Sequence, residues 1–142
     1  MEVSEVRRRV RAAVEQARRQ AAERRTRTDD AARAYEQFLT RIAVPAFHLV
    51  ATALAGEGHR FKVFTPVGTV RLSSERSADD YVELALDADR DRSTVIVRVN
   101  RGRGRRLISS EREVKPGKGI AELSEEDVID TVLEELAPFV ER

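Results

Sequence analysis

The spacing of the apolar residues changes twice along this 142-residue chain. In residues 2–55 apolar positions recur every three or four residues, as on one side of an α-helix. In residues 61–114 they recur every second residue, as on one face of a β-strand, and after residue 124 the helical spacing returns. These periods predict an α+β fold with a helical N-terminal half, a sheet and a closing helix.

The middle of the chain contains five alternating segments separated by short, turn-rich connections. Val82, Leu84 and Leu86, for example, alternate with more polar neighbours. Short connections favour antiparallel neighbours, because parallel strands need a crossover of about a dozen residues or more. We therefore predict a five-stranded antiparallel meander with one covered face, against which the C-terminal helix packs.

The first predicted helix carries a narrow apolar stripe of small side chains. Residues 2–26 contain no glycine or proline, and arginines occupy most of the remaining circumference. Small side chains bury little area at about 25 cal/mol per Å², so this segment is expected to need a partner. The stripe consists of Val3, Val6, Val10, Ala13, Val14, Ala17 and Ala21.

The segment 26–30 contains threonines and aspartates, which are typical of a helix start. This composition predicts a break near Thr28, although a single helix running through is the alternative because no glycine or proline interrupts it. The N-terminal half is thus expected to be one long helix or a helical hairpin. We assign residues 1–28 to a basic helical arm and residues 29–142 to one α+β domain.

The helix predicted over residues 30–55 is apolar on more than one side, with Pro45 expected to kink it. A helix of this kind is buried on more than one side, which favours a homodimer. A flank formed by Val44, Phe47 and Leu54 lies away from the main apolar face. The predicted oligomer interface combines this flank with the arm, and consists of Val44, Phe47, Leu54, Val6, Val10, Ala13 and Ala17.

The last helix is predicted to begin at Ser124, with Asp127 three residues later completing a capping box. Its apolar residues form one broad face, on which the helix is expected to pack against the sheet. That face comprises Val128, Ile129, Val132, Leu133, Leu136, Phe139 and Val140.

Charges are segregated along the chain, although the net charge is only +1. Residues 98–118 carry a net charge of +6 and residues 119–142 one of −7. Five arginines gather at a hairpin whose turn is predicted at residues 101–104, and arginine side chains bind nucleic-acid phosphates. No aromatic residues are interleaved for base stacking, and the alternative partner is the acidic C-terminal helix of the same or a neighbouring chain. The five are Arg98, Arg101, Arg103, Arg105 and Arg106.

The sequence predicts no catalytic residue, metal site or cofactor, and we expect the protein not to be an enzyme. Cysteine is absent, which excludes thiol chemistry and disulfides. The acids at 87–91 resemble the opening of a calcium loop, but Arg92 and Arg98 stand where the glycine and the bidentate glutamate belong. Neither His48 nor His59 is recognisably spaced to a nucleophile or an acid.

The expected location is the cytoplasm, with no membrane partner. The N-terminal residues do not resemble a secretory signal, and the longest charge-free run, 42–56, is short for a bilayer span of about 20 residues. The predicted function is a non-catalytic module for protein interaction or assembly, with an unidentified protein partner and a homodimeric state. The alternative is nonspecific nucleic-acid binding through the hairpin at 98–106.

Overall fold

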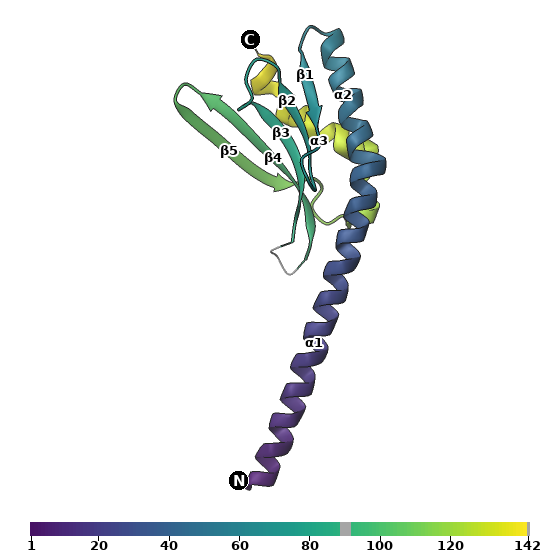
Figure 1. The fold of residues 1–142 in the computed structure, drawn as a ribbon, viewed down its shortest axis with the longest axis vertical. Coiled ribbons are helices and arrows are strands. Elements are labelled where there is room, and N and C mark those ends of the chain that lie inside the picture. The colour runs from purple at the N-terminus through teal and green to yellow at the C-terminus, as the bar shows by residue number, and fades with distance from the viewer. Residues whose placement is uncertain (89–91, 142) are drawn as a thin grey trace. The chain divides into compact units, whose positions relative to one another are not determined.

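The computed structural model describes residues 1–88 and 92–141, and it confirms the α+β architecture (Figure 1). The chain divides into two compact units, Met1–Ala32 and Arg33–Arg142. The first unit is helical, and the second contains the sheet. The elements are α1 (Val3–Phe38), η1 (Leu39–Ala43), α2 (Val44–Gly56), β1 (Phe61–Phe64), β2 (Val70–Ser74), β3 (Tyr81–Asp87), β4 (Thr94–Arg103), β5 (Arg106–Glu113), η2 (Ile120–Glu122) and α3 (Glu125–Val140).

The predicted break near Thr28 is wrong, because α1 is continuous from Val3 to Phe38. The hydroxyl of Thr26 donates a hydrogen bond to the Ala22 carbonyl oxygen at 3.1 Å. A threonine bonded back to the preceding turn is accommodated inside a helix instead of capping a new one. Of the two arrangements that the sequence left open, the structure has the long helix.

The hydrogen bonding of this helix changes where α1 meets α2. The segment η1 is a π-helix, and the backbone N–H of Val44 bonds to the carbonyl oxygen of Leu39. Pro45 follows in the first turn of α2, where the missing proline N–H is most easily tolerated. The helical path therefore continues through the proline to Gly56.

Gly58 follows α2 and ends the helix. Its φ of +87° lies in the left-handed region, and its N–H bonds to the Ala55 carbonyl oxygen at 3.1 Å. The N–H of His59 bonds to the Leu54 carbonyl oxygen at 2.8 Å. This pair of bonds is the Schellman arrangement, and it turns the chain into β1.

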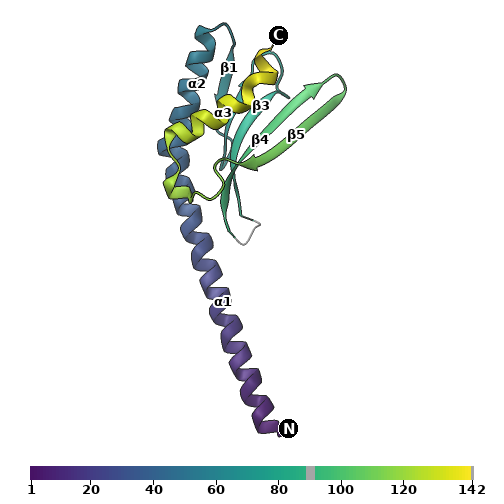
Figure 2. The same ribbon diagram turned by 180° about the vertical axis from the view of Figure 1, so that it is seen from behind.

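The five strands form one antiparallel meander in the order β1-β2-β3-β4-β5. On one face, Leu72, Val82 and Val99 are neighbours across three strands and are buried. On this face α2 contacts β1 and β2, while α3 contacts β3 and β4 (Figures 1 and 2). The hydrophobic core of the second unit lies between this face and the two helices.

The capping box at the start of α3 is confirmed. The Asp127 N–H donates to Ser124 Oγ at 3.1 Å, and the Ser124 N–H donates to Asp127 Oδ2 at 3.0 Å. Lys118 Nζ also donates to Asp127 Oδ2, at 2.7 Å. These contacts fix both the start of α3 and the loop that leads to it from β5.

By length and composition alone, the continuous helical stretch Val3–Gly56 is able to cross a membrane. The sequence predicted no membrane span, because its longest charge-free run, 42–56, is shorter than about 20 residues. One helix of this kind near the N-terminus is weak evidence, because the core helix of a soluble protein passes the same test.

Candidate functional site

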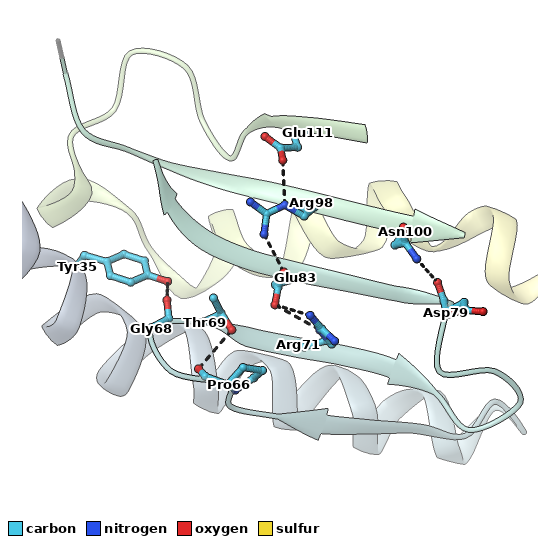
Figure 3. A network of polar contacts seen from close by, with 10 residues as sticks. All are labelled: Tyr35, Pro66, Gly68, Thr69, Arg71, Asp79, Glu83, Arg98, Asn100 and Glu111. Carbon is cyan, nitrogen blue, oxygen red and sulfur yellow. Dashed lines mark hydrogen bonds and ion pairs between the residues drawn. The ribbon is translucent and has the colours of Figure 1, made fainter. Parts of the chain in front are cut away.

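The sheet face opposite the helices carries a row of alternating charges (Figure 3). Strand register places Arg71, Glu83, Arg98 and Glu111 side by side across β2 to β5. Arg71 Nη2 donates to Glu83 Oε1 at 3.1 Å, and Arg98 Nη1 donates to Glu83 Oε2 at 3.0 Å. Arg98 Nε donates to Glu111 Oε1 at 2.9 Å. Each charge in the row is thus neutralised within the sheet.

Glu83 is the buried centre of this row, with only 4% of its side chain exposed. Both of its oxygens accept from arginines, so the carboxylate is compensated. The guanidinium of Arg71 also lies 3.9 Å from the centre of the Tyr81 ring. The hydrogen bond to Glu111, together with that to Glu83, raises the pKa of Arg98. The row is therefore a structural network that holds Arg98 in place.

The predicted arginine hairpin exists, but its turn lies further along the chain than expected. Arg103 and Arg106 form the last cross-strand pair, so the turn residues are Gly104 and Arg105. Gly104 has a φ of +64°, as the first central residue of a type II′ turn requires. Gly102 instead belongs to β4 and donates its N–H to Asp80 Oδ1 at 2.8 Å.

Strand alternation divides the five predicted arginines between different environments. Arg98 lies in the charge row, whereas Arg101 and Arg103 are on the opposite face of β4, and Arg106 shares their face because it pairs with Arg103. Within the part of the chain that the structure describes, the guanidinium groups of all except Arg98 form no hydrogen bond or ion pair. The five predicted residues are therefore not one site, and the four beyond Arg98 form the hairpin tip.

A sixth arginine, which the sequence analysis did not single out, joins the sheet to the C-terminal helix. Arg112 Nε donates to Glu135 Oε1 and its Nη2 to Glu134 Oε2, both at 2.7 Å. Within the described residues, the contact between the sheet and the acidic C-terminal helix is thus made by Arg112 and not by any of the five predicted arginines. Its signal was present in the sequence, because alternation places Arg112 on the same face as Val114, which is buried.

The outer surfaces of α2 and α3 enclose an apolar groove of about 370 Å³. Leu49 and Leu133 are 54% and 53% exposed here. The expectation that Leu133 packs against the sheet is therefore wrong, because α3 contacts the sheet over only part of its apolar surface. The groove is lined by Leu49, Val50, Ala53, Leu54, Glu57, Ile129 and Leu133.

The apolar stripe of the arm is exposed along α1. Val10, in its middle, is 56% exposed, and the stripe residues before and after it are exposed or half-buried. In the first unit, Met1–Ala32, the stripe therefore has no apolar cover.

The other predicted interface residues occupy three different environments. Phe47 is fully buried in the core of its own chain, so it does not belong to an exposed flank. Leu54 lines the groove between α2 and α3. Val44 lines a separate hollow with Leu39 and the connection from β1 to β2.

The residues considered for chemistry are spread over the second unit. His48 is exposed on α2, and His59 lies beside Arg60 and Glu75, just before the start of β1. Among residues 1–88 and 92–141, no group of three or more histidines and acids is placed to hold a metal ion. Most of the acidic turn compared with a calcium loop, residues 89–91, lies outside the described residues.

Comparisons with protein-family models, with curated proteins and with solved structures give no match to this chain.

Proposed function

We propose that this protein is a non-catalytic assembly module in which two copies of the chain bind each other. In this assembly, the arm stripe of one copy docks in the groove between α2 and α3 of the other. The observation that carries the proposal is the groove itself, where Leu49 and Leu133 are more than half exposed in an apolar lining. Exposed apolar surface that is continuous with a groove marks an interaction site.

The shape and chemistry of the arm fit such a groove. Amphipathic helices bind grooves through apolar residues spaced by three and four positions. The arm stripe has this spacing from Val3 to Ala21, and its alanines allow the two helix surfaces to approach closely. An extended contact of this kind buries apolar surface on both partners, which is the main source of association free energy.

Charge complementarity selects the arm over a second groove as the occupant. Residues 1–28 have a net charge of +5 and residues 119–142 one of −7. Glu126 and Asp130 are exposed and lie three residues before Ile129 and Leu133, on the same side of α3. Groove against groove would bring these acids together, whereas a basic helix neutralises them.

Reciprocal exchange of arms gives a closed dimer, because each copy donates one arm and offers one groove. Analytical ultracentrifugation over a range of concentrations tests this arrangement. We expect a species of twice the mass of the chain, and we expect Val10→Asp and Leu133→Asp each to yield monomers. Val67→Asp is the matched control, because Val67 is fully exposed outside the arm and the groove; this variant should remain dimeric.

Circular dichroism of the variants distinguishes lost association from lost folding, and both altered residues are exposed enough to tolerate a charge. A wild-type chain that stays monomeric at every concentration contradicts the proposal. So does a dimer that survives either substitution, because arm and groove are both required.

A further inference from the structure

The hairpin tip, defined above as Arg101, Arg103, Arg105 and Arg106, is a second surface, and no carboxylate among residues 1–88 and 92–141 pairs with its arginines. The segment 101–108 contains these four arginines and no acid. Arg103, Arg105 and Arg106 are exposed, and Arg101 is half-buried. The end of the hairpin extends away from α2 and α3 (Figure 2).

The last pair of residues in the hairpin, which are both arginines, repel each other when no anion is bound. Arg103 and Arg106 stand directly opposite each other across β4 and β5, and like charges in this position repel. Arg101 lies two residues from Arg103 on the same strand face, a spacing of about 7 Å. That separation is shorter than the Debye length of about 8 Å at physiological ionic strength, so the positive potentials add.

The nearest acids do not relieve this repulsion. Asp79 and Asp80 lie beside Gly102, but Asp80 Oδ1 accepts from the Gly102 N–H at 2.8 Å. The carbonyl oxygen of Asp79 accepts from Asn100 Nδ2 at 2.7 Å (Figure 3). These contacts anchor the base of the hairpin, and in the described chain neither carboxylate reaches an arginine of the tip. With no partner among the described acids, the tip is available to an external anion.

The residues beside the tip arginines indicate which polyanion the hairpin suits: a membrane surface, a single-stranded nucleic acid or a duplex. Leu107 pairs with Gly102 and Ile108 pairs with Arg101, so the two exposed apolar residues point to opposite faces of the ribbon. A membrane-surface element needs its apolar residues on one face. Single-stranded nucleic acid is bound by stacking on aromatic rings, and residues 98–113 contain no aromatic residue.

We propose that the hairpin tip binds the phosphate backbone of duplex nucleic acid, without preference for base sequence. A two-stranded ribbon has the width of the major groove, and guanidinium groups on one face and at the turn reach phosphates on its walls. Arg98 takes no part, because Glu83 and Glu111 already hold it. This inference is independent of the arm and groove assembly.

The test is a salt titration of the full chain against a labelled mixed-sequence duplex, followed by fluorescence anisotropy. Four phosphate contacts give a slope of about −3.6 in log K against log salt, or about a 150-fold loss of affinity between 50 and 200 mM salt. Changing Arg103→Gln and Arg106→Gln together should reduce the slope to about −1.8 and that loss to about 12-fold.

Two variants control for folding and for net charge. Arg103→Lys with Arg106→Lys keeps the charges and should keep the slope. Arg41→Gln with Arg60→Gln removes two exposed arginines outside the hairpin and should leave the slope within about half a unit of wild type. A slope unchanged by the glutamine pair at the tip overturns the inference, and so does the absence of duplex binding at 50 mM salt.

Vesicles of phosphatidylserine and of phosphatidylcholine are titrated in parallel with the duplex. We expect little binding to either, because the ribbon lacks an apolar face. Binding to the phosphatidylserine vesicles without binding to the duplex overturns the inference in favour of a membrane surface.

Discussion

Glu83 and Arg98 face each other across β3 and β4, and Arg98 Nη1 donates to Glu83 Oε2 at 3.0 Å. Because of this contact, Arg98 belongs to the ion pairs within the sheet and not to the arginines that could bind a partner. Arg98 is fixed between two carboxylates, while the arginines of the hairpin tip, further along the same hairpin, pair with no carboxylate in the part of the chain that the structure describes. On β4 the row of charges from Arg71 to Glu111 thus ends at Arg98, and the hairpin tip begins beyond it at Arg101.

Replacing Glu83 with glutamine should destabilise the fold. The change leaves Arg71 and Arg98 without their shared carboxylate, and hydrogen bonds to charged groups contribute about 1.5–3 kcal/mol each in favourable settings. Because both arginines are about one-third exposed and regain some hydration, we expect a loss of about 1–3 kcal/mol in the free energy of unfolding by urea. Glu111→Gln, at a mostly exposed carboxylate, should cost no more than about 0.5 kcal/mol. Equal losses for both variants would contradict a central role for Glu83.

Ser124→Ala should lower the free energy of unfolding by about 1 kcal/mol, because it removes the oxygen that accepts from the Asp127 N–H. Ser110→Ala is the matched control, since Ser110 is exposed on β5, and it should stay close to wild type. Urea unfolding followed by circular dichroism measures both. A wild-type value for Ser124→Ala would show that the capping box adds nothing to stability.

Acidification should weaken the start of α3. The hydrogen bond from Lys118, and after it that from the Ser124 backbone, lowers the pKa of Asp127 below its ordinary value of 3.8. A carboxylate whose pKa is depressed in the folded state stabilises the fold above the unfolded pKa, and this contribution is lost as the pH falls through the folded pKa. Lys118→Met should therefore be less stable than wild type at pH 7, and the difference should shrink below pH 3.8.

The measurement is urea unfolding of both proteins across this pH range. Lys115→Met serves as the control for the loss of a lysine in the same loop. A difference between Lys118→Met and wild type that is constant with pH would contradict the proposed coupling to Asp127.

Salt should weaken the assembly. The basic arm and the acidic side of α3 attract each other through exposed charges, and dissolved salt screens such charges. The dissociation constant of the dimer should therefore rise with sodium chloride. Neutralising Glu126→Gln and Asp130→Asn together should weaken the dimer at low salt and flatten its salt dependence. Sedimentation at several salt concentrations measures both effects, and a steep dependence retained by the double variant would place the electrostatic contact elsewhere.

The sequence predicted the sheet well because its constraints are local. Alternation and short turns determine an antiparallel meander, and Ser124 with Asp127 forms the expected capping box. The break predicted near Thr28 was wrong, because α1 is continuous there; the hydroxyl of the nearby Thr26 bonds back to the preceding turn instead of capping a new helix. Local composition does not distinguish these two states.

The candidate surfaces were less predictable, because they depend on which groups the tertiary fold neutralises or covers. Nothing in the spacing of Arg98 and Arg101 shows that Glu83 and Glu111 hold only the first. Similarly, Phe47 and Leu49 lie two residues apart on α2, yet one is in the core and the other is exposed. The helical period identifies α2 as apolar on several sides, but only the packing shows which side remains open.

The most direct test of the assembly is to mix the two monomeric variants. Val10→Asp lacks a functional arm but keeps its groove, whereas Leu133→Asp lacks the groove but keeps its arm. If arms bind grooves of the other copy, the mixture restores one contact, and sedimentation should detect a one-to-one complex weaker than the wild-type dimer. If the mixture stays monomeric under conditions in which the wild type is dimeric, the arm does not bind the groove and the central claim is wrong.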